Sequence, residues 1–122
     1  SDILKTKYAD LKVIAVEPND SAVISGDEPG PHPIQGIGPG FFPEVFNVDA
    51  IDSASRITIE EAYAEVKNIA RNEGILVGIS TGASLAAVRK LLAKADSNAT
   101  ILTMNYDTGE RYLSMEGMFI EE

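Results

Sequence analysis

The sequence predicts an α/β fold, with three layers around a largely parallel sheet, and two observations support this prediction. Short apolar segments alternate along the chain with segments of helical periodicity, which is typical of strands connected through helices. The first of these apolar segments, residues 12–17, contains four consecutive apolar residues, as strands covered on both faces do. The 122 residues, 44% of them hydrophobic, fit one domain with a hydrophobic core.

The first third of the chain predicts one strand and one long loop. The segment 12–17 reads as a buried strand that ends at Pro18. Between Asn19 and Pro43 there are five prolines and five glycines, which exclude a helix or a central strand. A loop of this length in a compact domain is usually functional.

The remaining residues predict helices and strands in alternation. A short strand at residues 55–57 leads into a helix, because Thr58 and Glu61 match a capping box and Gly74 is a typical helix end. Further elements follow in order: a strand ending near Ile79, a small-residue turn at 78–82, a second helix from about Ala83 to Ala95, and a third strand at 100–105. Glu116, Glu121 and Glu122 indicate a solvated tail.

Composition excludes several classes of partner. The net charge is −9, and the sequence has no cluster of lysine and arginine residues. This charge disfavours binding to nucleic acid and to anionic membrane surfaces. No segment approaches the roughly 18 apolar residues of a membrane span. The absence of cysteine excludes disulfides and thiolate metal sites. The chain is therefore expected to be soluble and cytoplasmic.

Two segments carry candidate binding residues. Ser80, Thr81 and Gly82 are predicted between a strand end and a helix start, where free N–H groups favour an acceptor; simple helix capping is the alternative. The glycines at 36, 38 and 40 lack the flanking strand and helix of a dinucleotide fingerprint. They allow the backbone to approach a small ligand closely, or they form a plain surface loop.

Metal and serine chemistry are both disfavoured. His32 is the only histidine, and neither a cysteine nor a nearby pair of carboxylates accompanies it, so no metal site is predicted. Ser80 or Ser114 as a nucleophile requires a base, and His32 has no evident relation to either serine. The residues taken alone do not name a reaction.

The order and spacing of four segments resemble the cysteine synthase (O-acetylserine sulfhydrylase) family; these are residues 16–21, 29–41, 74–83 and 108–114. The resemblance implies the tryptophan-synthase β-like fold, pyridoxal 5′-phosphate as cofactor, and a homodimer that forms L-cysteine from O-acetylserine and sulfide. It implies that Ser80 faces the pyridine nitrogen of the cofactor without enforcing a protonated ring, and that Gln35, Gly36, Ile37 and Gly38 form the substrate loop.

The resemblance also implies what this chain lacks. The family's Schiff-base lysine and phosphate loop lie upstream, and no lysine here has a matching context, so no catalytic residue is predicted. Residues 1–122 are identified as the C-terminal large-domain part of a cysteine synthase, itself expected to be inactive. The alternatives are a non-catalytic binding module and a cystathionine β-synthase or O-phosphoserine-using relative. In the family, the loop at His32 helps receive the tail of serine acetyltransferase. Pro33 replaces a usual lysine there and argues against that partner.

Overall fold

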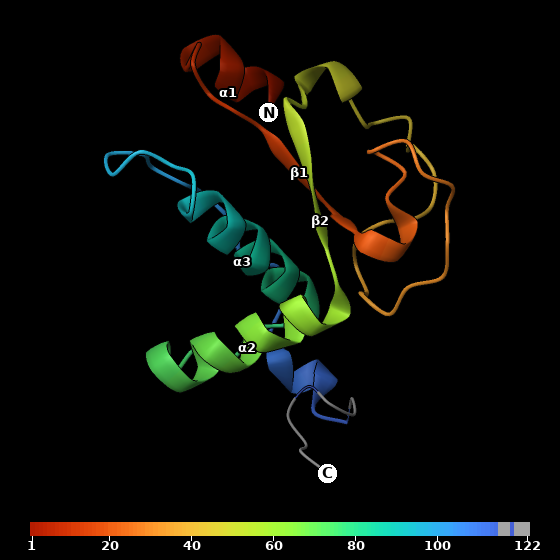
Figure 1. The fold of residues 1–122 in the computed structure, drawn as a ribbon, viewed down its shortest axis with the longest axis vertical. Helices are drawn as coiled ribbons and strands as arrows, with labels where there is room; N and C mark the ends of the chain where they lie inside the picture. Colours follow the sequence, from red (N-terminus) through yellow and green to blue (C-terminus); the bar gives the residue numbers. More distant parts are fainter. Residues whose placement is uncertain (115–117, 119–122) are drawn as a thin grey trace.

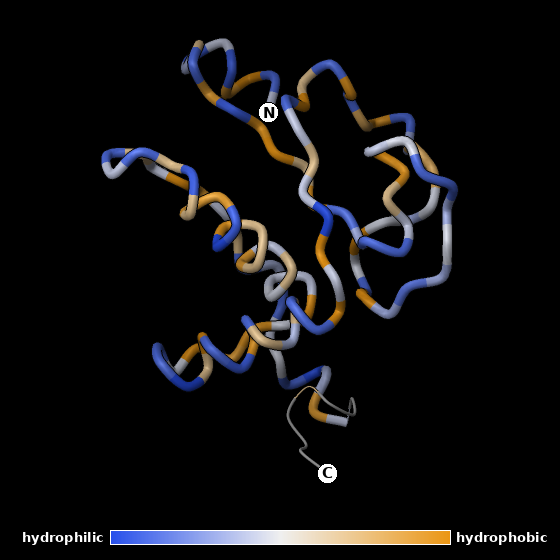
Figure 2. The backbone as a smooth tube through the Cα atoms, in the orientation of Figure 1, coloured by the Kyte–Doolittle hydropathy of each residue, from blue (hydrophilic) through white to orange (hydrophobic). Residues whose placement is uncertain are grey.

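The structure is a computed structural model that describes residues 1–114 and 118. Strands β1 (Ile14–Pro18) and β2 (Ser53–Ile57) pair in parallel, with Ile14 opposite Ser53 and Pro18 opposite Ile57. Figure 2 shows that hydrophobic residues predominate along the chain entering β1. The predicted burial of this strand is only partly confirmed, because Ile14, Ala15 and Val16 are half-buried whereas Glu17 and Pro18 are buried. The α/β character and the parallel pairing are confirmed. The predicted tail with Glu116, Glu121 and Glu122 lies outside the described residues.

Helices α2 (Ile59–Glu73) and α3 (Ile79–Leu92) pack against each other beside the two strands (Figure 1). A short helix α1 (Asp2–Lys7) precedes β1. Three 3₁₀ turns complete the elements: Asn19–Ser21, Val48–Ala50 and Gly109–Tyr112. No helix in the described part of the chain is long and apolar enough to cross a membrane.

Helix α2 begins and ends as predicted. The Thr58 hydroxyl accepts a hydrogen bond from Glu61 N at 3.3 Å, and the Glu61 carboxylate accepts one from Thr58 N at 2.9 Å. This reciprocal pair satisfies N–H groups that the first turn otherwise leaves free. Gly74 follows the helix in the left-handed region, with φ of +68°.

The predicted start of the second helix is wrong by one turn. Helix α3 begins at Ile79 and ends at Leu92, so the predicted small-residue turn at 78–82 is mostly helical. The glycine that suggested a turn has a different role, because Gly82 lets α3 pack tightly against α2. A Cβ added at Gly82 would lie 2.4 Å from Ala62 O and 2.5 Å from Val66 Cγ2. Gly82 is therefore the crossing point of α2 and α3 and not a turn residue.

The predicted strand at residues 100–105 is not observed, and neither is a strand before α3. A strand requires a hydrogen-bonding neighbour. Val77 forms only an isolated antiparallel bridge, with Thr108, and the side chains of Leu102 and Met104 are largely exposed. Apolar character alone therefore overpredicted the sheet in the part of the chain that the structure describes.

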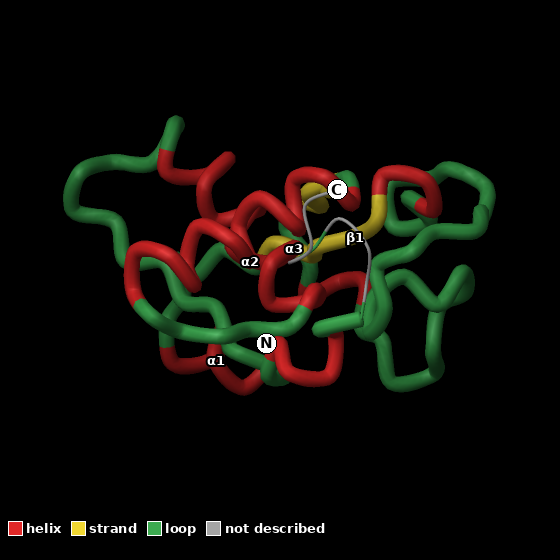
Figure 3. Tube along the Cα trace, turned by 90° about the horizontal axis from the view of Figure 1, so that it is seen from below, coloured by secondary structure: helices red, strands yellow, loops and turns green. Residues whose placement is uncertain are grey.

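The core lies between the strands and the two long helices. Ile57 of β2 and Ile34 of the long loop are buried there against residues of α2 and α3: Ala62, Ile79, Ala83, Ala86 and Ala87. Most of the long loop lies on the other side of β1 and β2 from α2 and α3 (Figures 1 and 3), but residues 34–37 reach the helical side, where Ile34 and Ile37 pack in the core. Ile34 thus ties this loop to the helical side.

Candidate functional site

The first turn of α3 places two buried hydroxyls at one end of the core. The N-cap residue is Gly78, and no side chain caps the helix. Ser80 is 7% exposed and Thr81 is 3% exposed. The capping alternative for these residues is therefore wrong, and their hydroxyls contact the segment 105–107 instead.

Thr81 serves to hold that segment in place. Its Oγ1 donates to Asn105 Oδ1 at 3.2 Å and accepts a hydrogen bond from Tyr106 N at 3.0 Å. Both bonds run between elements far apart in sequence. Because the Thr81 hydroxyl proton is engaged in this way, Thr81 has a structural role in fixing the wall next to Ser80.

Ser80 belongs to a chain of hydrogen bonds that ends at a tyrosine. The Ser80 hydroxyl donates to Asp107 Oδ1 at 3.4 Å, and the Tyr112 hydroxyl donates to Asp107 Oδ2 at 2.5 Å. The bond to Asp107, with burial adding to it, raises the pKa of the Tyr112 phenol above its ordinary value. Tyr112 therefore keeps its proton at neutral pH and acts as a donor. Sequence analysis missed both Asp107 and Tyr112 as site residues, because their meeting with Ser80 depends on the tertiary fold.

Asp107 is positioned by its backbone as well. Gly78 N donates to Asp107 O at 3.1 Å, and an added Cβ on Gly78 would lie 2.1 Å from Asp107 Oδ1. Only glycine at position 78 lets the carboxylate reach this place. The N-terminus of α3 and the segment at 107 are thus joined closely.

The predicted substrate loop lies directly against Ser80. An added Cβ on Gly36 would be 3.6 Å from Ser80 Cβ and 3.8 Å from Ser80 Oγ. Gly36 has φ of +90°, a conformation that glycine adopts without strain. Gln35 is exposed beside it, and Ile37 packs against the core. The structure therefore brings Ser80 and the loop 35–38 close together.

Gly38 anchors the far end of this loop to β1. An added Cβ there would lie 2.5 Å from the ring of Pro18, and φ is +60°. His32 Nε2 is 2.8 Å from Gly38 O, so the histidine donates to the loop backbone. His32 Nδ1 has no partner in the described part of the chain. His32 is thus a loop-shaping residue in this structure and contacts neither Ser80 nor Ser114.

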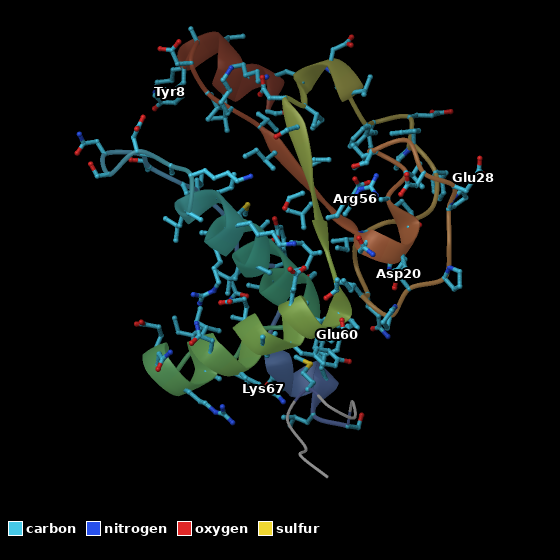
Figure 4. The ribbon with its side chains drawn as sticks, in the orientation of Figure 1. Tyr8, Asp20, Glu28, Arg56, Glu60 and Lys67 are labelled. Atoms are coloured by element: carbon cyan, nitrogen blue, oxygen red, sulfur yellow. The ribbon has the colours of Figure 1, made fainter. Side chains whose placement is uncertain are left out.

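Side chains from both strands fix the earlier part of the loop. Glu17 of β1, only 1% exposed, accepts hydrogen bonds from Ile24 N at 2.8 Å and from the Ser25 hydroxyl. Arg56 of β2 binds Asp27 Oδ2 at 2.7 Å and lies towards the loop in Figure 4. The position of Glu17 at the end of an apolar strand was the one sequence signal that its carboxylate holds the loop.

An apolar pocket of about 230 Å³ lies between this loop and β1, and Ser80 is not among the residues that line it. Ile37 and Gly38 line it, together with side chains of β1 and aromatic residues such as Phe41 and Phe46. Among residues 1–114 and 118, no three histidine, cysteine or carboxylate side chains are grouped as a metal site would need.

The lysines whose contacts are defined lie away from Ser80. Lys5 and Lys12 both contact the Asp52 carboxylate, at 2.7 and 3.9 Å. Lys90, in the last turn of α3, binds Glu61 and the Arg56 carbonyl. Lys67 lies on α2 (Figure 4). The absence of a catalytic lysine from this chain stays a prediction.

The sequence of this chain matches known proteins. A family model described as pyridoxal-phosphate dependent enzyme matches residues 2–107. The cysteine synthase of Staphylococcus aureus (strain Mu50) is 39% identical over 112 residues, which are 92% of this chain and 36% of that protein. The chain thus spans little more than one third of the length of this curated relative.

Solved structures agree with the sequence matches. The crystal structure of cysteine synthase from Entamoeba histolytica superposes with a TM-score of 0.93 at 37% identity, covering 99% of this chain and 36% of that one. An O-acetylserine dependent cystathionine beta-synthase from Helicobacter pylori gives a TM-score of 0.88 at 36% identity, covering 98% and 38%. The fold of this chain is therefore shared with the matching part of these enzymes.

Proposed function

The chain belongs to the family of pyridoxal-phosphate-dependent enzymes, and from this premise we propose that it forms one wall of the cofactor site of a cysteine synthase. The proposed reaction is the formation of L-cysteine from O-acetylserine and sulfide. Its cofactor is pyridoxal 5′-phosphate, which supplies the electron sink for replacement at the β-carbon when it is bound. The observation that carries the proposal is the close approach of the candidate substrate loop to the candidate cofactor residue: a Cβ added at Gly36 would lie 3.6 Å from Ser80 Cβ.

The residues at this contact fit a flat aromatic ring with a polar atom. Ser80 offers a hydroxyl that no helix cap uses, and Gly36 presents backbone without a side chain opposite it. Backbone N–H groups of the first turn of α3 add positive potential. In the proposal, Ser80 lies at the pyridine nitrogen.

The loop 35–38 then binds the substrate next to the ring. Its glycines let backbone groups approach an amino acid closely, and the exposed Gln35 side chain lies at the edge of the site. The anchors at Pro18 and His32 hold the loop in this conformation, which limits the access of water. The chain's own contribution is therefore orientation of cofactor and substrate, with the covalent anchor supplied by residues outside it.

We further propose a cytoplasmic homodimer as the working form. The family resemblance supports both, and the absence of cysteine is compatible with a cytoplasmic setting. Gel filtration with light scattering measures the dimer directly. A monomer at micromolar concentration contradicts this part of the proposal and leaves the reaction untouched.

The test is made on the full-length protein encoded by the reading frame that contains this chain. After reconstitution with pyridoxal phosphate, cysteine is quantified from O-acetylserine with sulfide, and cystathionine from O-acetylserine with homocysteine. We expect sulfide to be the preferred nucleophile. A preference for homocysteine would move the assignment to the activity named for the Helicobacter pylori neighbour. Cofactor binding without either product would favour a non-catalytic binding module.

A matched pair of variants ties the result to the site. Ser80→Ala removes the proposed ring contact, whereas Ser84→Ala removes an equally buried hydroxyl one turn later in α3. We expect Ser80→Ala to change the cofactor absorbance spectrum and Ser84→Ala to leave it as in the parent. Equal spectra for the parent and both variants would contradict the role of Ser80.

A further inference from the structure

We infer that Thr81 and Asn105 are positioning residues, whose side chains form a latch that holds residues 105–107 against the first turn of α3 before the cofactor binds. The inference rests on the proposed function, because it takes Ser80, the neighbour of Thr81, as the residue at the cofactor. The latch takes part in no chemical step. Its effect is on how tightly pyridoxal phosphate binds.

The segment that the latch holds has little other support. Residues 99–106, all within the described part of the chain, belong to no helix or strand. The side chains of Leu102, Met104 and Tyr106 are largely exposed, so burial does not fix their positions. The backbone is attached only from Asp107 onwards, where Gly78 N donates to Asp107 O at 3.1 Å. Residues 105 and 106 therefore depend on side-chain contacts.

The backbone of α3 does not extend this attachment to residues 105 and 106. Gly78 O already accepts a hydrogen bond from Gly82 N at 3.0 Å, at the start of the helix. The carbonyl groups that follow accept from N–H groups one turn later in the same way. A side chain supplies the acceptor instead, because Thr81 Oγ1 accepts from Tyr106 N at 3.0 Å.

The Thr81 hydroxyl is used in both directions. A backbone N–H can only donate, so the hydroxyl oxygen accepts from Tyr106 and its one hydrogen remains for another partner. That hydrogen is donated to Asn105 Oδ1 at 3.2 Å. Thr81 is buried, which limits the access of water to both bonds. One hydroxyl therefore holds two successive residues of the segment.

The latch fixes the surroundings of Ser80 from two directions. Thr81 follows Ser80 in the first turn of α3, and Asp107 Oδ1, in the held segment, lies 3.4 Å from Ser80 Oγ. A site that is ordered before its ligand arrives does not lose affinity to the cost of ordering. Without the latch, residues 105–107 would have to be ordered when the cofactor binds, and the affinity would fall.

The affinity of the full-length protein for pyridoxal phosphate tests the latch. The cofactor is removed with hydroxylamine, and the apparent Kd is measured by absorbance as pyridoxal phosphate is added back. Thr81→Val keeps the shape of the side chain but removes the hydroxyl, and its Kd should rise roughly tenfold, as expected for one net hydrogen bond. Thr81→Ser keeps the hydroxyl and should restore the affinity of the parent.

Asn105 provides a second variant, and it lies at an exposed position. Asn105→Ala keeps the bond from Tyr106 N, so its Kd should rise by less than that of Thr81→Val. Because Asn105 acts through the Thr81 hydroxyl, adding Asn105→Ala to Thr81→Val should cause no further rise. Effects that add in the double variant would contradict a single latch. Ser84→Ala, which removes another buried hydroxyl of α3, should bind as the parent does.

Urea unfolding with and without cofactor separates positioning from a merely structural bond. A bond that is equally strong in both forms would lower both free energies of unfolding and leave the Kd unchanged. The latch predicts a larger loss in the form with cofactor, because the affinity falls as well.

The outcomes are distinct. An unchanged Kd in folded Thr81→Val overturns the inference and leaves the proposed function standing. If Thr81→Val fails to fold, an unchanged Kd in Asn105→Ala overturns the inference in the same way. A parent that binds no pyridoxal phosphate overturns the proposed function and, with it, the premise of the inference.

Discussion

Replacing Gly82 with alanine tests how closely α2 and α3 approach each other at the site end of the core. An added Cβ would lie 2.4 Å from Ala62 O and 2.5 Å from Val66 Cγ2, both on α2. One of these atoms belongs to the backbone, so a change of rotamer cannot relieve the overlap. The two helices must move apart, and Ser80 lies only two residues away in α3.

The expected magnitude combines two opposing effects. Overpacking of a close contact costs about 1–3 kcal/mol, and the backbone overlap places this site at the upper end of that range. Alanine in a helix interior is favoured over glycine by about 1 kcal/mol. The free energy of unfolding should therefore fall by roughly 2 kcal/mol in Gly82→Ala, the difference between about 3 and about 1.

Urea unfolding followed by circular dichroism measures this difference, provided that the slope with urea stays constant. Ala64→Gly, on the exposed side of α2, calibrates the propensity effect and should lose about 1 kcal/mol. The sign for Gly82→Ala is decisive, because propensity alone predicts a gain. A variant as stable as the parent, or more stable, would refute the close crossing.

Four further predictions concern the same elements. Thr58→Ala should lower the free energy of unfolding by about 1 kcal/mol through loss of the cap, and Thr58→Ser should retain it; equal losses would contradict the capping role. Desolvation raises the pKa of Glu61, but hydrogen bonds from Lys90 and Thr58 outweigh it, and the hydrogen bond from Arg89 lowers the pKa of Glu65. Because folding lowers both pKa values, the stability that the two carboxylates contribute is fully present above the ordinary pKa of 4.5. It is lost as the pH falls through their pKa values in the folded state. A urea midpoint independent of pH in that range would contradict this prediction. Gly38→Ala should expose the loop 29–40 to proteolysis, since its Cβ would overlap the Pro18 ring, and unchanged cleavage would argue against the anchor. The 122-residue chain mixed with pyridoxal phosphate should show no persistent imine absorbance band, whereas a stable band at one lysine would contradict the missing anchor.

Local chemistry made some elements predictable. The capping box of Thr58 and Glu61, and Gly74 after the helix, define α2 by interactions within a few residues. The strand β1 was also predictable, because a short uninterrupted apolar run is typical of a strand in a parallel sheet that is covered on both faces. The formation of these elements depends mainly on interactions between residues that are close in sequence.

Other features depend on distant partners and could not be predicted. Residues 100–105 have the apolar character of a strand, yet a strand forms only when a neighbour supplies hydrogen bonds. Gly82 reads as a turn residue until the backbone of α2 is seen beside it. Likewise, Asp107 and Tyr112 become site residues only because the fold returns them to Ser80.

The contact between the loop and Ser80 lies between these two cases. The family resemblance predicted both partners, Ser80 and residues 35–38, but not that Gly36 would lie so near the Ser80 side chain that an added Cβ would be in van der Waals contact with it. This juxtaposition depends on Ile34, which is buried in the core against residues of α2 and α3 and thereby carries the loop to that side.

The most direct test of the account is a crystal structure of the full-length holoenzyme with pyridoxal phosphate bound. The account predicts the pyridine nitrogen within hydrogen-bonding distance of Ser80 Oγ, with Asp107 on the far side of that hydroxyl and the loop 35–38 beside the ring. A cofactor ring bound elsewhere, with Ser80 contacting only protein, would contradict it.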